Sequence, residues 1–235
     1  MREVSRSARM PRRVPGYELL HLLTMAQMVQ RLPGPANVLV VGAGTGQEVL
    51  RLAQARPDWR FTATDVSADM LALARQNFVE AGIAARVRMH VGALDALDVG
   101  QGYDAALMIL VAHFVPHDGR KQALFEAIAH RLKPGAPLLL ADLMAAADGW
   151  ERPAHKHACM TLGLSEEAAD AVLKGFESDF HSLDETELKA VLARSGFSAP
   201  AAYFRALGFA AYATTRASGH AEDEPVRLDS AQEAV

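Results

Sequence analysis

The segment "VLVVGAGTGQE", residues 38–48, constrains the fold more than any other part of this 235-residue chain. Four apolar residues, 38–41, run directly into three glycines at alternate positions, Gly42, Gly44 and Gly46. Glycine lets the backbone turn tightly and lets a ligand approach the main chain closely. A buried strand that leads through such a turn into a helix is typical of the nucleotide-binding unit of a parallel α/β sheet.

The rest of the chain alternates between strand-like and helix-like segments. We expect further strands at 60–64, 86–91, 105–110 and 137–141. We expect helices at 17–32, 45–55, 67–81 and 118–132, with Ser67 as the N-cap of the third. Residues 145–192 show no strand pattern and indicate two or three helices, and 201–206 and 209–215 indicate an edge hairpin around Gly208. This order predicts a Rossmann-like, doubly wound, mostly parallel seven-stranded sheet with an N-terminal helix and a helical insert after strand 5.

The length suits one α/β domain with appendages. We expect a flexible basic arm at 1–14, the domain at 15–216 with the insert at about 145–195, and a disordered polar tail at 217–235. The single cysteine, Cys159, excludes an intramolecular disulfide framework and favours a reducing, cytoplasmic location. No apolar run has the length of a membrane span, and the basic N-terminus lacks the apolar region of a secretory signal.

The spacing of the glycines distinguishes between nucleotides. The dinucleotide fingerprint G-x-G-x-x-G would need glycine where this chain has Gln47, which disfavours a nicotinamide oxidoreductase. A G-x-G-x-G turn after the first strand is instead usual in S-adenosylmethionine-dependent methyltransferases. Asp65 ends the second strand roughly twenty residues later, where an acid can accept hydrogen bonds from both ribose hydroxyls. We therefore expect S-adenosylmethionine as the cofactor.

The ends of the other strands supply the remaining cofactor candidates. Gly92, Ala93 and Leu94 can frame the adenine edge through main-chain contacts, and Asp95 either accepts from the adenine amino group or only starts a turn. The end of the fourth strand reaches the carboxyl edge of the sheet, where such folds bind ligands. The expected cofactor-binding residues are Tyr17, Gly42, Ala43, Gly44, Gly46, Asp65, Val66, Met70, Ala93, Leu94, Ile109 and Leu110.

The glycine turn, the acid, the adenine loop and the "LKPG" segment at 132–135 together resemble the class I methyltransferases. The segment "RVPGYELLHLLTMAQMV" and the helical insert also resemble the carboxy-S-adenosylmethionine synthase family, which serves wobble-uridine modification in tRNA. This narrower resemblance covers about residues 13–215. It implies that Tyr17 contacts the cofactor, together with Gly42, Ala43 and Gly44, with Asp65 and Val66, and with Ala93 and Leu94. It also makes a homodimer a reasonable expectation.

Three positions depart from these patterns. The narrower family's cofactor-contacting Asn falls at Ile109, and its Arg for the extra carboxylate falls at Leu173. Without that guanidinium a buried carboxylate would lack its bidentate partner, so we expect ordinary S-adenosylmethionine. Methyltransferases often carry an acid two residues before the first glycine, near the cofactor's amino group, where this chain has Val40. Weaker cofactor binding through Val40 is an open alternative.

The catalytic residues stay open at this point, with His113, His117 and Tyr17 as candidates that border the site. Each histidine can act as a general base or merely line the site, since methyl transfer to many nucleophiles needs no strong base. We expect no metal. His155, His157 and Cys159 alternate along a helix and would point to different sides.

The insert also bears on the methyl acceptor. Residues 142–189 contain eleven acidic and only four basic side chains, which would repel a polyanionic RNA. We therefore expect a small-molecule acceptor and no nucleic acid or membrane partner. Two alternatives remain: a tRNA-modification enzyme of the carboxy-S-adenosylmethionine type, suggested by the basic arm, and a non-catalytic cofactor-binding protein, suggested by Val40 and Ile109.

Overall fold

The computed structural model describes residues 10–97, 102–146 and 148–218. Seven strands form one sheet: β1 (Asn37–Val41), β2 (Arg60–Asp65), β3 (Val87–Val91), β4 (Ala105–Ile109), β5 (Pro137–Leu143), β6 (Ala201–Ala206) and β7 (Phe209–Thr215). The helices are α2 (Met10–Arg13), α3 (Tyr17–Arg31), α4 (Gln47–Ala55), α5 (Ala68–Glu80), α6 (Arg120–Arg131), α7 (Glu151–Thr161), α8 (Glu166–Ser178) and α9 (Glu185–Arg194). The described helices include none with the length and apolar character needed to cross a bilayer.

The strand order is β3-β2-β1-β4-β5-β7-β6, and the first five strands run parallel. β7 pairs antiparallel with β5 and β6, so the last two strands form the expected hairpin at the sheet edge. The order reverses between β1 and β4, and ligands of open α/β sheets bind in the crevice at such a switch point. The predicted doubly wound, mostly parallel seven-stranded sheet is confirmed.

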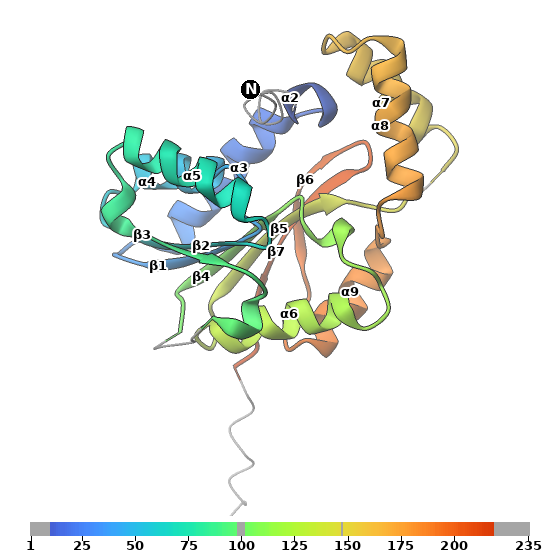
Figure 1. Cartoon of the computed structure of the whole chain (residues 1–235). Coiled ribbons are helices and arrows are strands. Elements are labelled where there is room, and N and C mark those ends of the chain that lie inside the picture. The colour runs from blue at the N-terminus through green and yellow to red at the C-terminus, as the bar shows by residue number, and fades with distance from the viewer. Residues whose placement is uncertain (1–9, 98–101, 147, 219–235) are drawn as a thin grey trace, which may run out of the picture.

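Helices cover both faces of the sheet (Figure 1). Side chains of α3, α4 and α5 share one buried cluster, which includes Leu20, Val49 and Phe78. Side chains of α6 and α9 belong to a second cluster on the other face, which includes Phe125 and Leu192. α7 and α8 pack on each other beyond the hairpin (Figure 1), and with α9 they account for the predicted insert.

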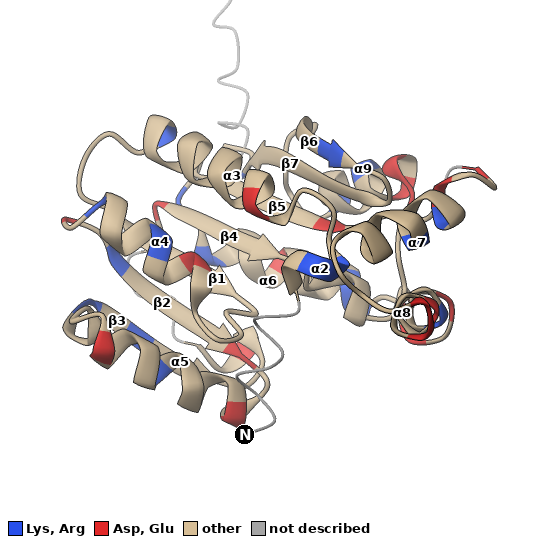
Figure 2. Cartoon of the chain, turned by 90° about the horizontal axis from the view of Figure 1, so that it is seen from above, with Lys and Arg blue, Asp and Glu red and all other residues tan. Residues whose placement is uncertain are grey.

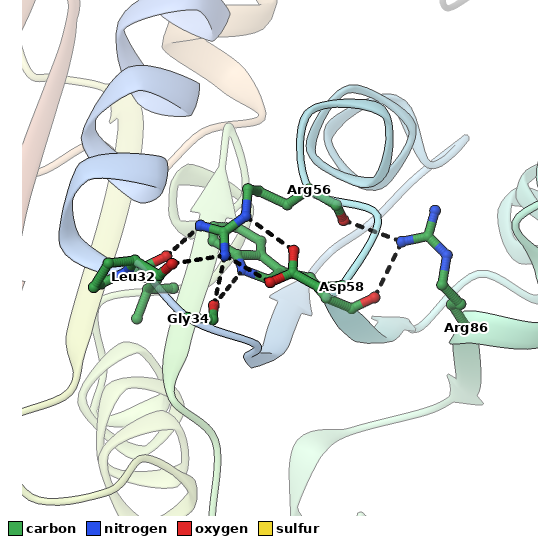
Figure 3. Close-up of polar contacts among 7 residues, drawn as sticks. Leu32, Gly34, Arg56, Asp58 and Arg86 are labelled. Carbon is green, nitrogen blue, oxygen red and sulfur yellow. Dashed lines mark hydrogen bonds and ion pairs between the residues drawn. The ribbon is translucent and has the colours of Figure 1, made fainter.

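Arg56 fastens the connection between α3 and β1 (Figure 3). This connection lies at the amino ends of the parallel strands, whereas the glycine turn lies at their carboxyl ends. Its guanidinium donates to the carbonyl oxygens of Leu32 and Gly34 and to the carboxylate of Asp58. Arg86 donates in turn to the carbonyl oxygen of Arg56, 3.1 Å away. The bonds from Arg56 satisfy carbonyl oxygens at and just after the end of α3, and the bond from Arg86 satisfies the one at the end of α4.

Some element boundaries differ from the predicted ones. α4 begins at Gln47 and not at residue 45, because Gly46 adopts a left-handed conformation with φ +82°. β5 continues to Leu143 and not only to residue 141, because Asp142 and Leu143 pair with Ala210 and Phe209 of β7. The extension places Asp142 at the carboxyl edge of the sheet.

The predicted N-terminal arm and C-terminal tail fall only partly on the residues that the structure describes. Residues 1–9 of the expected arm and 219–235 of the expected tail lie outside them. Met10–Arg13 form α2, and Val14 is 2% exposed. The carbonyl oxygen of Arg13 accepts from Nε2 of His155 at 2.9 Å and faces the Cys159 thiol at 3.7 Å. This part of the expected arm therefore packs against α7.

Candidate cofactor and acceptor site

The three glycines of the turn after β1 differ in how closely other residues pack against them. All three have positive φ, at +66° for Gly42, +54° for Gly44 and +82° for Gly46. A β-carbon on Gly42 would overlap the side chain of Val111, and one on Gly46 would overlap the ring of Phe78. A β-carbon on Gly44 would meet no heavy atom within 4 Å. The outer glycines therefore permit close packing, and the middle one leaves its main chain open to a ligand.

Because of this contrast, we expect alanine at Gly46 to destabilise the fold more than alanine at Gly44. Gly46→Ala adds both backbone strain and overlap with Phe78, and should lower the free energy of unfolding by about 2–4 kcal/mol. Gly44→Ala adds only the backbone strain and should cost about 1 kcal/mol. Urea unfolding of both variants measures the difference. Equal losses of stability would contradict the assignment of Gly46 to packing.

Asp65 ties the glycine turn to the end of β2. Its Oδ2 accepts from the backbone N–H of Gly44 at 2.9 Å, and its Oδ1 accepts from the backbone N–H of Ser67 at 2.9 Å. The N–H of Ala43 donates to the carbonyl oxygen of Thr64 at 2.8 Å. Ser67 caps α5 by accepting from the N–H of Met70, as the sequence predicts. Asp65 is half-buried, and each oxygen of a carboxylate can accept further bonds.

The neighbouring expected residues gather at the same edge. The N–H of Gly92 donates to the carbonyl oxygen of Asp65 at 2.9 Å, which joins the ends of β2 and β3. Val66 is 81% exposed beside this junction. Ala93 is exposed, whereas the Leu94 side chain is buried in the core, so that only its main chain can serve a ligand. Asp95 is exposed.

The end of β4 carries backbone strain that the sequence does not reveal. Leu110 has φ +58°, a conformation that residues other than glycine rarely adopt. Its N–H donates to the carbonyl oxygen of Ala141 at 2.7 Å, which holds the strained residue against β5. Ile109, at the position of the resembling family's Asn, is 8% exposed and lies within the core cluster. Strained residues of this kind cluster at ligand sites.

His113 and Asp142 form a buried pair at the ends of β4 and β5. Nδ1 of His113 donates to Oδ1 of Asp142. Because an ionised carboxylate can only accept, the neutral imidazole carries its proton on Nδ1 and its lone pair on Nε2. Nε2 makes no hydrogen bond to any described residue. The pair therefore has the arrangement of an oriented general base. The sequence pattern does not reveal the role of Asp142, which there is only one of the acids of the insert.

Aromatic rings and a buried lysine hold this pair in place. The His113 ring lies 4.2 Å from the ring of Phe114 and 4.5 Å from that of Phe180, between centroids. The carbonyl oxygen of His113 accepts from the N–H of His181 at 2.7 Å. Lys121 is fully buried and donates to the carbonyl oxygen of His181, and burial lowers the pKa of its amine. The segment that follows α8 is thus fastened against the His113–Asp142 pair.

Tyr17, His21 and Glu48 form a second polar cluster, between α3 and α4. The Tyr17 and His21 rings meet edge-to-face with centroids 4.3 Å apart, and Nε2 of His21 lies 3.8 Å from Oε1 of Glu48. Burial lowers the pKa of His21 to about 4 and raises the pKa of Glu48 to about 7. Burial, and then the charge of Glu48, raise the pKa of Tyr17. His21 is therefore neutral near pH 7, so His21 and Glu48 do not form an ion pair although they lie close together.

The raised pKa of Glu48 has a consequence for stability. Below about pH 4.5 the folded and unfolded chains both hold the proton, but above it the unfolded chain ionises first. The free energy of unfolding therefore falls as the pH rises from about 4.5 through 7, by up to about 3 kcal/mol. Glu48→Gln should thus be more stable than the wild type at pH 8, and gain less at pH 5. Thermal unfolding at both pH values, with the exposed Glu80→Gln as control, measures this, and an equal effect at both would contradict it.

The remaining candidates lie apart from this edge or lack partners. His117 is exposed. His155 and Cys159 are buried and His157 is exposed, so the three do not face one point. Within the described ranges, no three histidine, cysteine or acidic side chains lie together as metal ligands would. A separate hollow beside α7 includes none of the glycine-turn residues, and is lined by Asp148, Trp150, Glu151, Ala154, Arg205 and Leu207.

Comparison with known proteins agrees with this geometry. Residues 39–138 match the family model described as a methyltransferase domain. A 113-residue part of the chain is 30% identical to the biotin biosynthesis bifunctional protein BioHC of Teredinibacter turnerae, covering 46% of this chain and 19% of that protein. A 60-residue part is 42% identical to the release factor glutamine methyltransferase of Streptococcus pneumoniae, covering 26% and 20%. The chain thus matches only about a fifth of the length of these relatives.

Solved structures extend the likeness to the whole fold. The N-methyltransferase NodS of Bradyrhizobium japonicum, bound to S-adenosylhomocysteine, has a TM-score of 0.59 at 13% identity, with 86% of this chain and 88% of that chain covered. The S-adenosylmethionine-dependent methyltransferase SibL, in its apo form, has a TM-score of 0.63 at 19% identity, with 85% and 55% covered. Human N-acetylserotonin methyltransferase with S-adenosylmethionine has a TM-score of 0.58 at 16% identity, with 84% and 51% covered. Residues 39–138 therefore match a methyltransferase domain, and the chain as a whole has the fold of the class I S-adenosylmethionine-dependent methyltransferases.

Proposed function

We propose that this chain transfers a methyl group from S-adenosylmethionine to a small-molecule acceptor. The observation that carries the proposal is the open main chain of Gly44, held by Asp65 at the switch point of the sheet. His113 and Asp142 stand at the ends of the two adjoining strands, β4 and β5. A cofactor cradle and an oriented base thus share one edge of the sheet.

The chemistry divides between the cofactor and the chain. When bound, S-adenosylmethionine supplies a methyl group on a positively charged sulfur. The chain holds the acceptor in line with the sulfur–methyl bond, and positioning of this kind provides much of the rate. For a hydroxyl acceptor, Nε2 of His113 would take the hydroxyl proton as the acceptor oxygen accepts the methyl group. Asp142 keeps the lone pair on Nε2 and stabilises the imidazolium that results.

A small acceptor is supported by the charge of the insert. Glu166, Glu167 and Asp170 lie on α8, where acidic colour gathers in Figure 2. Such a surface opposes the approach of RNA phosphates. The solved relatives include an O-methyltransferase of Planctomyces limnophilus in complex with apigenin, with a TM-score of 0.58 at 19% identity, and 78% of this chain and 52% of that chain covered. We also propose a homodimer in the cytoplasm, on the resemblance and the single cysteine.

Two measurements, made one after the other, test the proposal. Titration calorimetry with S-adenosylmethionine and S-adenosylhomocysteine should detect binding. Release of S-adenosylhomocysteine should then be followed with a panel of phenols, hydroxy acids and amines, and with total tRNA. No binding of either nucleoside would contradict the function, and turnover confined to tRNA would overturn the choice of a small acceptor. Tight binding without turnover on any member would instead favour a non-catalytic cofactor-binding protein.

A further inference from the structure

We propose that Glu48 binds the α-ammonium group at the amino-acid end of the cofactor, with Tyr17 and His21 closing the site around it. The inference rests on the proposed function, since it assigns a part of the same cofactor site. Glu48 lies in the first turn of α4, two residues after Gly46 and four after the open Gly44. Tyr17 and His21 are one turn apart on α3 and so face the same side.

Among the described residues, no cation is free to pair with the carboxylate of Glu48. His21 is neutral at pH 7, and Tyr17 holds its proton. Arg51, the nearest guanidinium on α4, donates to Oε2 of Glu18 at 2.8 Å on the more exposed side. These are the titratable groups that reach the cluster from α3 and α4. A carboxylate in such surroundings is costly unless a cation binds to it.

A second observation points to an absent ligand. Nε2 of His21 is buried and has no hydrogen-bond partner in the part of the chain that the structure describes, and the residue is only 3% exposed. Buried polar atoms of this kind are rare in folded proteins. The Glu48 side chain is 15% exposed, so the cluster is not sealed from outside. The carboxylate and the orphaned ring nitrogen lie 3.8 Å apart, so one group can contact both of them.

The chemistry of the cluster selects an ammonium. An ammonium has three N–H donors and a full charge, which suit a carboxylate and a neutral acceptor nitrogen together. The edge of the Tyr17 ring is already packed on His21, which holds both rings beside the carboxylate. The sulfonium of the cofactor is also cationic but has no hydrogen to donate. Val40, where an acid is usual, has an apolar side chain buried at 2% exposure, so the negative charge at the turn comes from Glu48.

The test compares two ligands that differ only at the amino-acid end. S-Adenosylhomocysteine carries the ammonium, and 5′-methylthioadenosine lacks the whole amino-acid group. We expect Glu48→Gln to weaken S-adenosylhomocysteine binding by about 10- to 100-fold and to leave 5′-methylthioadenosine binding within about twofold, as expected for a charged hydrogen bond. The exposed Glu80→Gln serves as the matched control and should change neither affinity.

Proton release provides a second readout that needs no variant. An ammonium that binds Glu48 lowers the pKa of this carboxyl from about 7, so protons leave the protein on binding at pH 7. Calorimetry in two buffers of different ionisation enthalpy should detect release with S-adenosylhomocysteine and none with 5′-methylthioadenosine. Equal release with both ligands would overturn the proposal. So would equal losses of both affinities in Glu48→Gln, or no loss, whereas a wild type that binds neither ligand would contradict the proposed function itself.

Discussion

Replacement of Asp65 by asparagine is expected to weaken S-adenosylhomocysteine binding by at least about 100-fold, because the carboxylate is expected to accept from both ribose hydroxyls in charge-assisted hydrogen bonds of about 1.5–3 kcal/mol each. The same carboxylate also holds the glycine turn through the N–H groups of Gly44 and Ser67. The asparagine oxygen can accept from only one of the two backbone N–H groups, of Gly44 and Ser67. Its amide N–H₂ would face the other donor and push it away. The glycine turn would lose the bond that fixes its open main chain.

The expected loss has two parts that can be separated. The expected bonds to the ribose hydroxyls vanish, and the turn itself relaxes. Calorimetry measures the affinity, and urea unfolding should show a loss of about 1–3 kcal/mol, the cost of an unsatisfied buried donor. Asp69→Asn is the matched control, because Asp69 is an exposed acid in the first turn of α5. An affinity within threefold of the wild type would contradict the placement of the cofactor at Asp65.

The sequence predicts the parts of this site that depend on neighbours along the chain. The alternation of strands and helices, the glycine turn, the Ser67 cap and the edge hairpin all follow from local pattern, and all are confirmed in the fold. The doubly wound arrangement follows as well, because parallel crossovers leave few arrangements open. Where the boundaries differ, as at the start of α4, the backbone of a single glycine decides.

The sequence does not predict contacts between elements that are far apart along the chain. Gly46 needs to be glycine because Phe78 of α5 lies against it, and a motif alone does not distinguish this from the open Gly44. The left-handed Leu110 carries no composition signal, since glycine would be expected there. Glu48 lies within the motif segment but gains its character from burial beside His21 on α3. The partner of His113 lies on a different strand, at Asp142.

The His113–Asp142 pair carries the largest expected effect on turnover. His113→Gln should lower kcat for a hydroxyl acceptor by about 10²- to 10⁴-fold, the usual contribution of a general base. Glutamine keeps much of the volume between the Phe114 and Phe180 rings but cannot take up a proton. The affinity for S-adenosylhomocysteine should stay within a few-fold of the wild type, because His113 is assigned to the acceptor. His130→Gln, an exposed histidine in the last turn of α6, is the control.

Asp142→Asn separates orientation from proton transfer. The asparagine oxygen can still accept from Nδ1 of His113, but it no longer stabilises the imidazolium with a full charge, and its amide can turn to stabilise the wrong tautomer. We therefore expect a fall in kcat without a matching rise in KM, and a smaller dependence of rate on pH in both variants than in the wild type. A general base also predicts that a more acidic phenol, which is already ionised, is methylated at nearly the same rate by His113→Gln and the wild type. Equal losses for ionised and un-ionised acceptors would show that the histidine only shapes the site, and the base would then have to be sought elsewhere along the edge of the sheet.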